Sequence, residues 1–293
     1  MKNLLLFLLI FVNSSIFSQE IYPTVELPAV VQNLEEILVS SIRVKKNAPI
    51  AFSNVSKDEL AKKNLGQDLP ILLNFLTSVV TTSDAGAGIG YTGIRIRGVN
   101  AQSTNITING IPYNDAESLG TFWVDLPDFA SSVENLQVQR GIGTSTNGSS
   151  AFGASINILT DKISKKPYFE TSNSIGSYNT IKNTFKFSTG ILNKYFEFSG
   201  RLSKIDSDGY IDRATSDLKS YFLQGTYKRN TTMIKALSFG GHEITYQAWN
   251  GVDRETLVSD RRYNPSGMYI DESENVQFYN NEVDNYKQDH YQL

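Results

Sequence analysis

Residues 113–123 are the part of this sequence whose residue types best suit the binding of an organic molecule. The segment sets aromatic rings beside amide, hydroxyl and carboxylate groups, in the order Tyr113, Asn114, Asp115, Ala116, Glu117, Ser118, Leu119, Gly120, Thr121, Phe122 and Trp123. Aromatic surfaces with a few polar partners are typical of ligand pockets. The same composition also suits a loop that folds onto an aromatic core of its own, and the sequence favours neither alternative.

Catalytic chemistry is not indicated at any position in the chain. Two pairs of carboxylates could in principle serve as acid and base: Asp115 with Glu117, and Asp125 with Asp128. Each pair lies among turn residues, where solvated carboxylates are common. The chain has 2 histidines, far apart in the sequence, and no cysteine, so we expect no metal site. We therefore expect neither an enzyme nor a cofactor.

The glycines of residues 88–93 have the spacing of a dinucleotide-binding loop, Gly-Ile-Gly-Tyr-Thr-Gly. Such a loop needs a helix directly after it, because the helix N-terminus binds the pyrophosphate. The next residues are Ile94-Arg95-Ile96-Arg97, which have the alternation of a strand. We therefore interpret this segment as a flexible, glycine-rich apex.

The overall composition indicates a folded protein that does not bind nucleic acid. The chain has 293 residues, of which 40% are hydrophobic and 19% charged, which suffices for one large or two ordinary domains. Its 27 basic and 30 acidic residues are spread along the chain and give a net charge of -3. No basic stripe is present that would attract phosphates.

Residues 1–18 are predicted to be an export signal peptide. Lys2 precedes an apolar run from Leu4 to Val12, which is shorter than the ~20 residues of a membrane-spanning helix. We place the cleavage after Ser18. Nothing after residue 20 offers ~18 consecutive apolar residues. A mature protein in a membrane would therefore have to cross it with the strands of a barrel.

Residues 41–163 are expected to form a compact α+β domain, after a mobile leader at residues 19–40. Ser56 and Glu59 have the spacing of a helix capping box. A second short helix is expected over residues 68–76, with a proline in its first turn. Alternating segments bounded by Gly, Asn or Asp predict strands at residues 94–98, 105–110, 136–141 and 155–160.

Residues 166–293 contain longer alternating stretches without helical signals. Apolar residues such as Phe196 and Phe198 share one face, and polar residues such as Glu197 and Arg201 share the other. Strands that are apolar outside and polar inside are typical of a transmembrane β-barrel, although a soluble antiparallel sandwich would show the same alternation. The expected connections are short at residues 190–194 and 228–231 and long at residues 203–220 and 240–285.

Four segments resemble, in the same order, the plug motifs of the TonB-dependent outer-membrane receptor family: Arg95–Gly98, Ile108–Pro112, Val133–Gly141 and Ala151–Thr160. The resemblance covers residues 34–163 and continues more loosely to the end, where the chain looks like the barrel of Bacteroidetes-type receptors. It implies an α+β plug domain followed by antiparallel strands of a transmembrane β-barrel. Such barrels have about 22 strands, and we count five here with a sixth beginning. We therefore expect an N-terminal fragment with an incomplete barrel, which by itself would not form a working pore.

The resemblance also implies site residues. A short β-prone run occupies the place of the TonB box, although taken alone it favours a plain first strand of the next domain: Glu36, Ile37, Leu38, Val39 and Ser40. The implied ligand contacts at the plug apices are Tyr91, Gln102, Tyr113, Asn114, Asp115, Glu117, Phe122 and Trp123. Arg95 and Arg97 look like plug arginines that form ion pairs with barrel glutamates, a role that suits the guanidinium group.

The function implied by the resemblance is active uptake of a scarce nutrient across the cell outer membrane, for example a ferric siderophore or another iron complex. Its partners would be TonB with its inner-membrane energising complex, the nutrient ligand and outer-membrane lipid. The alternative is a secreted or surface-exposed binding or adhesion protein with an α+β head and a β-rich tail. That alternative predicts a water-soluble product after removal of the signal peptide.

Overall fold

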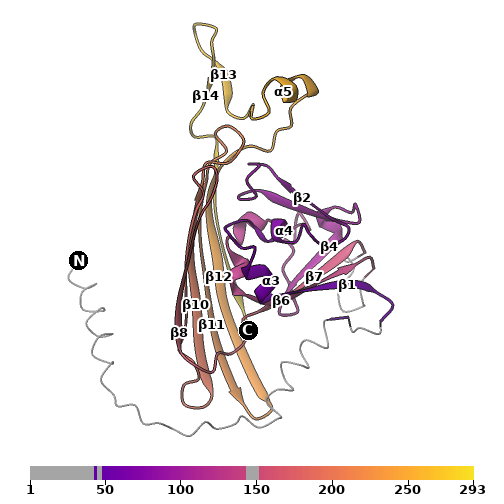
Figure 1. Ribbon diagram of the computed structural model, residues 1–293, viewed down its shortest axis with the longest axis vertical. Coiled ribbons are helices and arrows are strands. Elements are labelled where there is room, and N and C mark those ends of the chain that lie inside the picture. The colour runs from indigo at the N-terminus through magenta and orange to yellow at the C-terminus, as the bar shows by residue number, and fades with distance from the viewer. Residues whose placement is uncertain (1–42, 45–47, 143–151) are drawn as a thin grey trace, which may run out of the picture.

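The computed structural model describes residues 43–44, 48–142 and 152–293. They form an α+β domain and a tall, curved sheet that lies along one side of it (Figure 1). The expected signal peptide and leader lie outside the described residues. Within these ranges, every helix is too short or too polar to cross a membrane.

A five-stranded mixed sheet forms the centre of the α+β domain, in the order β1-β6-β7-β4-β5. Its strands are β1 (Ala51–Ser56), β4 (Thr104–Ile108), β5 (Ile111–Pro112), β6 (Val133–Arg140) and β7 (Ala154–Thr160). β4 and β7 run parallel, and the other neighbours run antiparallel. Fully buried aliphatic side chains form the core on this sheet, among them Leu136, Val138, Ile156 and Ile158. Three predicted strands are confirmed here as β4, β6 and β7, with somewhat different ends.

Short helices and a hairpin complete the α+β domain. In α3 (Lys57–Ala61), the Ser56 hydroxyl accepts from the Glu59 amide and the Glu59 carboxylate accepts from the Ser56 amide, which confirms the capping box. The second helix, α4 (Leu69–Leu72), has Pro70 in its first turn as predicted but is shorter than expected. β2 (Val79–Ser83) and β3 (Thr92–Ile96) form the hairpin that contains the predicted strand at residues 94–98.

The tall sheet has six antiparallel strands in the order β15-β12-β11-β10-β9-β8. They are β8 (Tyr168–Ile175), β9 (Ile181–Ser188), β10 (Phe196–Ser207), β11 (Ser216–Arg229), β12 (Thr232–Tyr246) and β15 (Val283–Gln292). Its outward face is apolar and exposed: Phe185 is 47%, Phe198 51% and Leu202 57% accessible. The face toward the α+β domain carries buried polar residues. A soluble sandwich packs its apolar face against the other layer, whereas here the polar face packs against the α+β domain.

Glycine at position 200 makes room on the outward face. Gly200 lies opposite Phe187 on β9 and Leu223 on β11. A Cβ at this position would lie 2.7 Å from the Phe187 ring and 2.9 Å from Leu223. The absent side chain therefore lets two large apolar groups of neighbouring strands cover the strand between them.

The connections at the two ends of the sheet differ in length, as predicted. Residues 189–195 and 230–231 link strands at one end, where the turns are drawn at the bottom of Figure 1. The longest connection, residues 247–282, stands at the other end and contains α5 (Arg254–Ser259), β13 (Met268–Ile270) and β14 (Val276–Phe278). The prediction of a long loop over residues 203–220 was wrong. β10 continues to Ser207 and β11 begins at Ser216, so the loop between them comprises only residues 208–215.

Candidate functional site

Residues 123–132 of the α+β domain pack against the inner face of the six-stranded sheet. They form two short 3-10 helices, η3 (Trp123–Asp125) and η4 (Phe129–Ser132). The Phe129 ring centroid lies 6.0 Å from that of Phe222 and 5.4 Å from that of Phe239. Gly241 permits this close approach, because a Cβ there would lie 2.4 Å from the carbonyl oxygen of Asp125. Apolar packing thus holds the polar groups of this segment against the strands.

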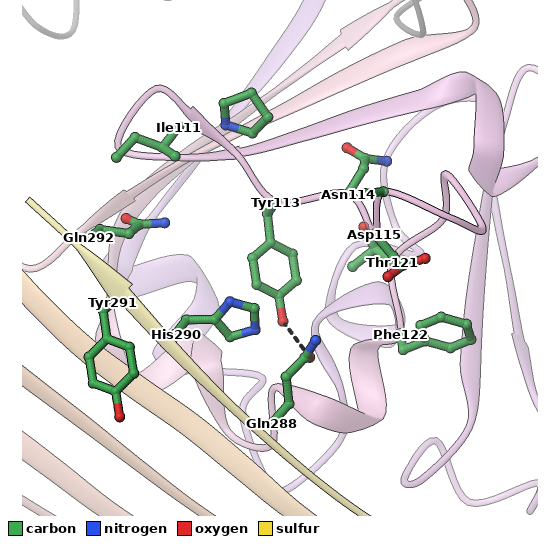
Figure 2. A pocket seen from close by; sticks show the side chains of 12 residues that line it. Ile111, Tyr113, Asn114, Asp115, Thr121, Phe122, Gln288, His290, Tyr291 and Gln292 are labelled. Atoms are coloured by element: carbon green, nitrogen blue, oxygen red, sulfur yellow. Dashed lines mark hydrogen bonds between the residues drawn. The ribbon is translucent and has the colours of Figure 1, made fainter.

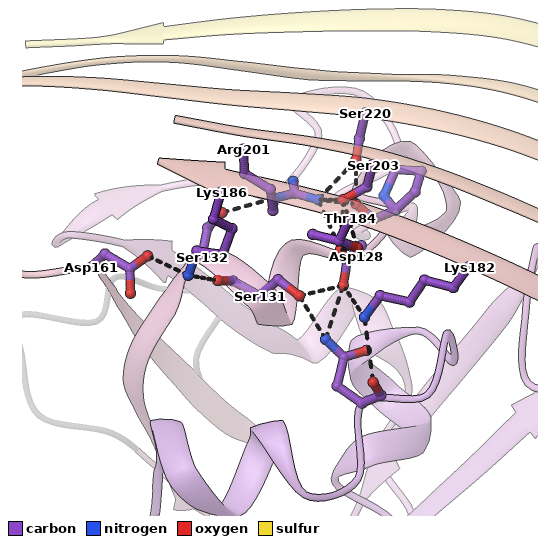
Figure 3. A network of polar contacts seen from close by, with 12 residues as sticks. Asp128, Ser131, Ser132, Asp161, Lys182, Thr184, Lys186, Arg201, Ser203 and Ser220 are labelled. Atoms are coloured by element: carbon purple, nitrogen blue, oxygen red, sulfur yellow. Dashed lines mark hydrogen bonds and ion pairs between the residues drawn. The ribbon is translucent and has the colours of Figure 1, made fainter. Parts of the chain in front are cut away.

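Asp128 is the centre of a buried polar network between the α+β domain and the six-stranded sheet (Figure 3). Its carboxylate pairs with the Lys182 ammonium of β9 at 2.8 Å and with the Arg201 guanidinium of β10 at 3.4 Å. The three side chains are 0%, 2% and 1% exposed, respectively. The carboxylate also accepts hydrogen bonds from four neutral side chains of both bodies: Asn64 (2.9 Å), Ser131 (2.6 Å), Thr184 (2.7 Å) and Ser203 (2.6 Å).

The charges around Asp128 keep it ionised. Burial by itself raises the pKa of the Asp128 carboxyl, but Arg201 and Lys182 outweigh this effect and hold the pKa below its ordinary value. The Arg201 guanidinium also donates to Ser132 at 2.9 Å and to Ser220 at 3.0 Å. Buried charges are tolerated where they are paired and hydrogen-bonded in this way.

Asp161 forms a second connection between the α+β domain and the sheet. Its carboxylate pairs with Lys57 of α3 at 2.6 Å and with Lys186 of β9 at 3.0 Å. Burial raises the pKa of Asp161, but Lys186 and Lys57 outweigh burial and lower the pKa overall. Its backbone carbonyl accepts from Gln224 at 3.1 Å and from Lys235 at 3.2 Å. Two carboxylates of the α+β domain therefore bind cations of the sheet.

This interface was not predicted from the sequence. Asp125 and Asp128 were expected to be solvated turn carboxylates, but they are only 4% and 2% exposed. The available signal was the basic character of the polar strand face, where Lys182, Lys186 and Arg201 alternate with apolar neighbours. Cations on the inner face of a sheet need anions opposite them, and turn residues far away in the sequence supply these anions.

Segment 111–122 forms a pocket against the edge of β15 (Figure 2). Its volume is about 320 Å³, and Tyr113, Asn114, Asp115 and Phe122 line it together with Gln288, His290 and Tyr291. The Tyr113 hydroxyl donates to the Gln288 amide oxygen at 3.5 Å, and its ring lies 4.8 Å from that of His290. Burial raises the pKa of Tyr113, so this phenol remains a neutral donor. The pocket offers aromatic rings and amide groups to a ligand.

Asn114 and Asp115 shape the loop as well as line the pocket. The Asn114 side chain accepts from the Ile106 amide at 2.7 Å and donates to the carbonyl oxygens of Thr104 and Leu119. The Asp115 carboxylate accepts from the Ser118 amide at 2.6 Å, and backbone hydrogen bonds lower its pKa. These bonds fix the backbone of the loop that carries Tyr113 and Phe122.

The comparison with protein families identifies the α+β domain. Residues 44–155 match the model of the TonB-dependent receptor plug domain. This segment is a TonB-dependent receptor plug domain. The matched range contains β1 to β6 with both helices, η2 (Ala101–Ser103), η3 and η4.

Similarity to known receptors extends beyond the plug domain. The chain is 26% identical over 261 residues to the probable TonB-dependent siderophore receptor PirA of Acinetobacter baumannii, covering 81% of this chain and 32% of that protein. It is 28% identical over 183 residues to the vitamin B12 transporter BtuB of Vibrio vulnificus, covering 61% and 29%. The chain thus spans about a third of the length of these curated relatives, which are transport receptors and not enzymes.

The solved structures share the fold of both bodies. The ferric yersiniabactin uptake receptor FyuA of Yersinia pestis superposes with a TM-score of 0.53 at 18% identity, covering 67% of this chain and 32% of that one. The arrangement of a plug domain followed by antiparallel strands therefore resembles the fold of that receptor. The six strands described here do not close into a barrel.

The other expected ligand residues of the plug domain occupy different places. Trp123 is 3% exposed and belongs to the plug core, so it does not line the pocket. Gln102 and Glu117 are exposed and lie outside the pocket lining. The Tyr91 hydroxyl lies within hydrogen-bond distance of a carboxylate oxygen of Glu243 (3.1 Å) and of Asp284 (2.8 Å), to which it can donate. Its ring lies edge-on to that of Trp249. Tyr91 therefore joins the plug to β12, β15 and the long loop rather than to the pocket.

The expected plug arginines have no carboxylate partner within the described residues. Arg95 and Arg97 are exposed, and Arg97 has a positive φ of 56° at the end of β3. The ion pairs that the structure does show between plug and sheet have the opposite polarity, with the carboxylates of Asp128 and Asp161 on the plug. The expected TonB box, residues 36–40, lies outside the described residues.

Proposed function

We propose that this chain is part of a TonB-dependent outer-membrane receptor that imports a scarce nutrient, specifically a ferric siderophore or another iron complex. The observation that carries the proposal is the plug domain seated on the polar face of a sheet whose opposite face is apolar and exposed. Such a sheet suits a membrane wall with a polar interior. The names of the relatives, which include a siderophore receptor and a vitamin B12 transporter, support this nutrient class.

The domain division expected from the sequence is kept as part of the proposal. It comprises a signal peptide at residues 1–18, a leader with the TonB box at 19–40, the plug domain at 41–163 and barrel strands at 166–293. Placement in the cell outer membrane and membership of the Bacteroidetes-type receptors belong to the same proposal. The adhesion alternative is not favoured, because the exposed apolar sheet face would have to be in water.

The ligand would contact the pocket beside β15 through Tyr113, Asn114, Asp115 and Phe122. The exposed apex residues Gln102 and Glu117 and the half-buried Tyr91 would contribute from neighbouring loops. Aromatic rings supply contact area, and the amide and carboxylate groups orient the ligand by hydrogen bonds. No step of this scheme requires a resident cofactor.

Transport would need the plug to move away from the strands. TonB would capture residues 36–40 by adding a strand, and the inner-membrane complex would supply the energy. The movement would have to separate Asp128 from Lys182 and Arg201, and Asp161 from Lys186. These buried ion pairs would keep the plug in place until a force acts on it.

The test is deletion of residues 36–40 in the cell that makes the protein. Accumulation of radioactive iron from ferric siderophores should stop, while binding of the same complexes to the cell surface should stay unchanged. A deletion of the same length within the leader, residues 26–30, serves as the control and should leave uptake intact. Unchanged uptake after the first deletion, or recovery of the protein in the soluble fraction, would contradict the proposed function.

A further inference from the structure

Basic residues gather at the end of the six-stranded sheet that carries the short turns. Three segments meet there: residues 164–167, which precede β8, the β9–β10 connection at 189–195, and the β11–β12 turn at 230–231. The backbone of Lys166 and Pro167 lies against Gly190, and the Lys228 amide donates to the Tyr195 carbonyl. These segments and the adjoining end of β11 expose four cations and carry no carboxylate: Lys165, Lys166, Lys194 and Arg229.

The cations stand next to exposed aromatic rings of the outward face. The ring of Tyr227 lies 6.3 Å from Tyr195 and 5.0 Å from Phe196, and the Arg229 guanidinium lies 5.3 Å from the centre of the Tyr195 ring. Lys165, Lys166 and Lys194 are exposed, as are Phe196 and Phe198 above them. Aromatic rings beside basic side chains are the arrangement that suits the boundary between lipid chains and headgroups.

The opposite end of the sheet has the opposite charge. The β10–β11 region, residues 204–219, carries 4 acidic and 3 basic residues, and Lys204 is paired with Asp206 at 2.7 Å and with Asp217 at 2.5 Å. Residues 247–282 add 7 acidic and 3 basic residues. One of these basic residues, Arg262, is already paired with Asp212 at 3.2 Å. An anionic surface would therefore be attracted to the short-turn end and repelled by the long-loop end.

We propose that the short-turn end, defined by Lys165, Lys166, Lys194 and Arg229, binds the phosphate headgroups of anionic phospholipids. The exposed aromatic and aliphatic residues of the adjoining face contact the acyl chains. This contact fixes the depth of the sheet in the membrane and places the short turns at an anionic leaflet surface. The inference rests on the proposed function to the extent that the outward face lies in lipid.

The experiment uses the protein as its own cell makes it, purified from membranes in a neutral detergent. Phosphatidylglycerol and phosphatidylcholine with identical acyl chains are titrated separately, and bound lipids are counted by native mass spectrometry. The first variant is the triple substitution Lys165→Gln, Lys166→Gln and Lys194→Gln. The matched control removes three cations at the other end through Arg254→Gln, Arg261→Gln and Arg262→Gln.

The parent protein should retain phosphatidylglycerol in preference to phosphatidylcholine, and the preference should weaken as salt is raised. Because each cation near an anionic lipid surface adds to the attraction, the first triple variant should bind phosphatidylglycerol at least about tenfold more weakly. The control variant should match the parent, and a variant with arginine at the same three lysine positions should retain binding. If the first variant is not produced in the membrane, two other results test the proposal: retained phosphatidylglycerol binding in the arginine variant, and a weaker preference of the parent at high salt.

Equal retention of the two lipids, or equal losses in the first variant and the control, would overturn the lipid site while leaving the receptor proposal intact. Recovery of the parent protein outside the membrane fraction would overturn both. The two failures are therefore distinguishable.

Discussion

Substitution of Asp128 by asparagine should loosen the plug domain from the sheet. The change keeps the size of the side chain but removes the charge that faces Lys182 and Arg201, which are 2% and 1% exposed. Removing one member of a buried ion pair costs about 3–5 kcal/mol, because the remaining charges lose their counter-ion and cannot reach water. With about 1.4 kcal/mol for each factor of ten, the plug should separate from the sheet roughly a hundredfold to a few thousandfold more often.

Hydrogen exchange measured by mass spectrometry suits this prediction. Peptides that cover residues 126–140 and 180–188 report on the two sides of the interface, and their protected amides should exchange faster by the stated factor. Because the pKa of Asp128 is held below its ordinary value by Arg201 and Lys182 despite burial, its contribution is lost only as the pH falls through that lowered pKa. The effect of Asp128→Asn should therefore be constant between pH 5 and pH 8, because this whole range lies above the ordinary aspartate pKa of about 4.

Two further variants make the test specific. Asp206 pairs with Lys204 at 2.7 Å, but its side chain is 46% exposed, so Asp206→Asn should change stability by less than about 1 kcal/mol. Adding Lys182→Met to Asp128→Asn removes one of the uncompensated cations and should recover part of the lost protection. An amide exchange rate in Asp128→Asn within twofold of the parent's rate would refute the electrostatic reasoning. A double variant whose loss of protection equals the sum of the losses in the two single variants would also refute it.

Three other outcomes are expected from the same interface and the pocket. Burial, together with the charge of Glu243, raises the pKa of Asp125 to about 7, so the folded state should lose stability as the pH rises from about 4 to about 7. Asp125→Asn should therefore raise the Tm above that of the parent at pH 8 and leave it unchanged at pH 4; equal Tm values at pH 8 would contradict this. Gly241→Ala places a Cβ 2.4 Å from the Asp125 carbonyl oxygen and should cost about 1–3 kcal/mol in chemical denaturation. Gly251→Ala, with nothing within 4 Å, is its control and should be neutral. Phe122→Ala should weaken binding of a ferric siderophore about tenfold in calorimetry, since an aromatic contact is worth roughly 1 kcal/mol beyond its area, whereas the exposed Phe169, outside the pocket, should be replaceable by alanine without effect on affinity.

Local patterns in the sequence were sufficient to predict the elements that local physical chemistry controls. Ser56 and Glu59 form their capping box because both partners lie within one helical turn. The alternation around Phe198 and Arg201 predicted two faces of opposite character, since successive side chains of a strand point to opposite sides. The ordered motifs between residues 95 and 160 likewise indicated the plug domain that the family comparison shows.

The tertiary structure decided which distant residues meet, and therefore which charges are buried. Asp128 and Lys182 lie far apart in the chain, and nothing near Asp128 in the sequence distinguishes it from a solvated turn residue. Trp123 looked like part of a binding loop, but the packing of η3 against the sheet placed it in the core. The polarity of the ion pairs between plug and sheet could not be read from Arg95 or Arg97, because desolvation and pairing depend on the groups that folding brings opposite each side chain.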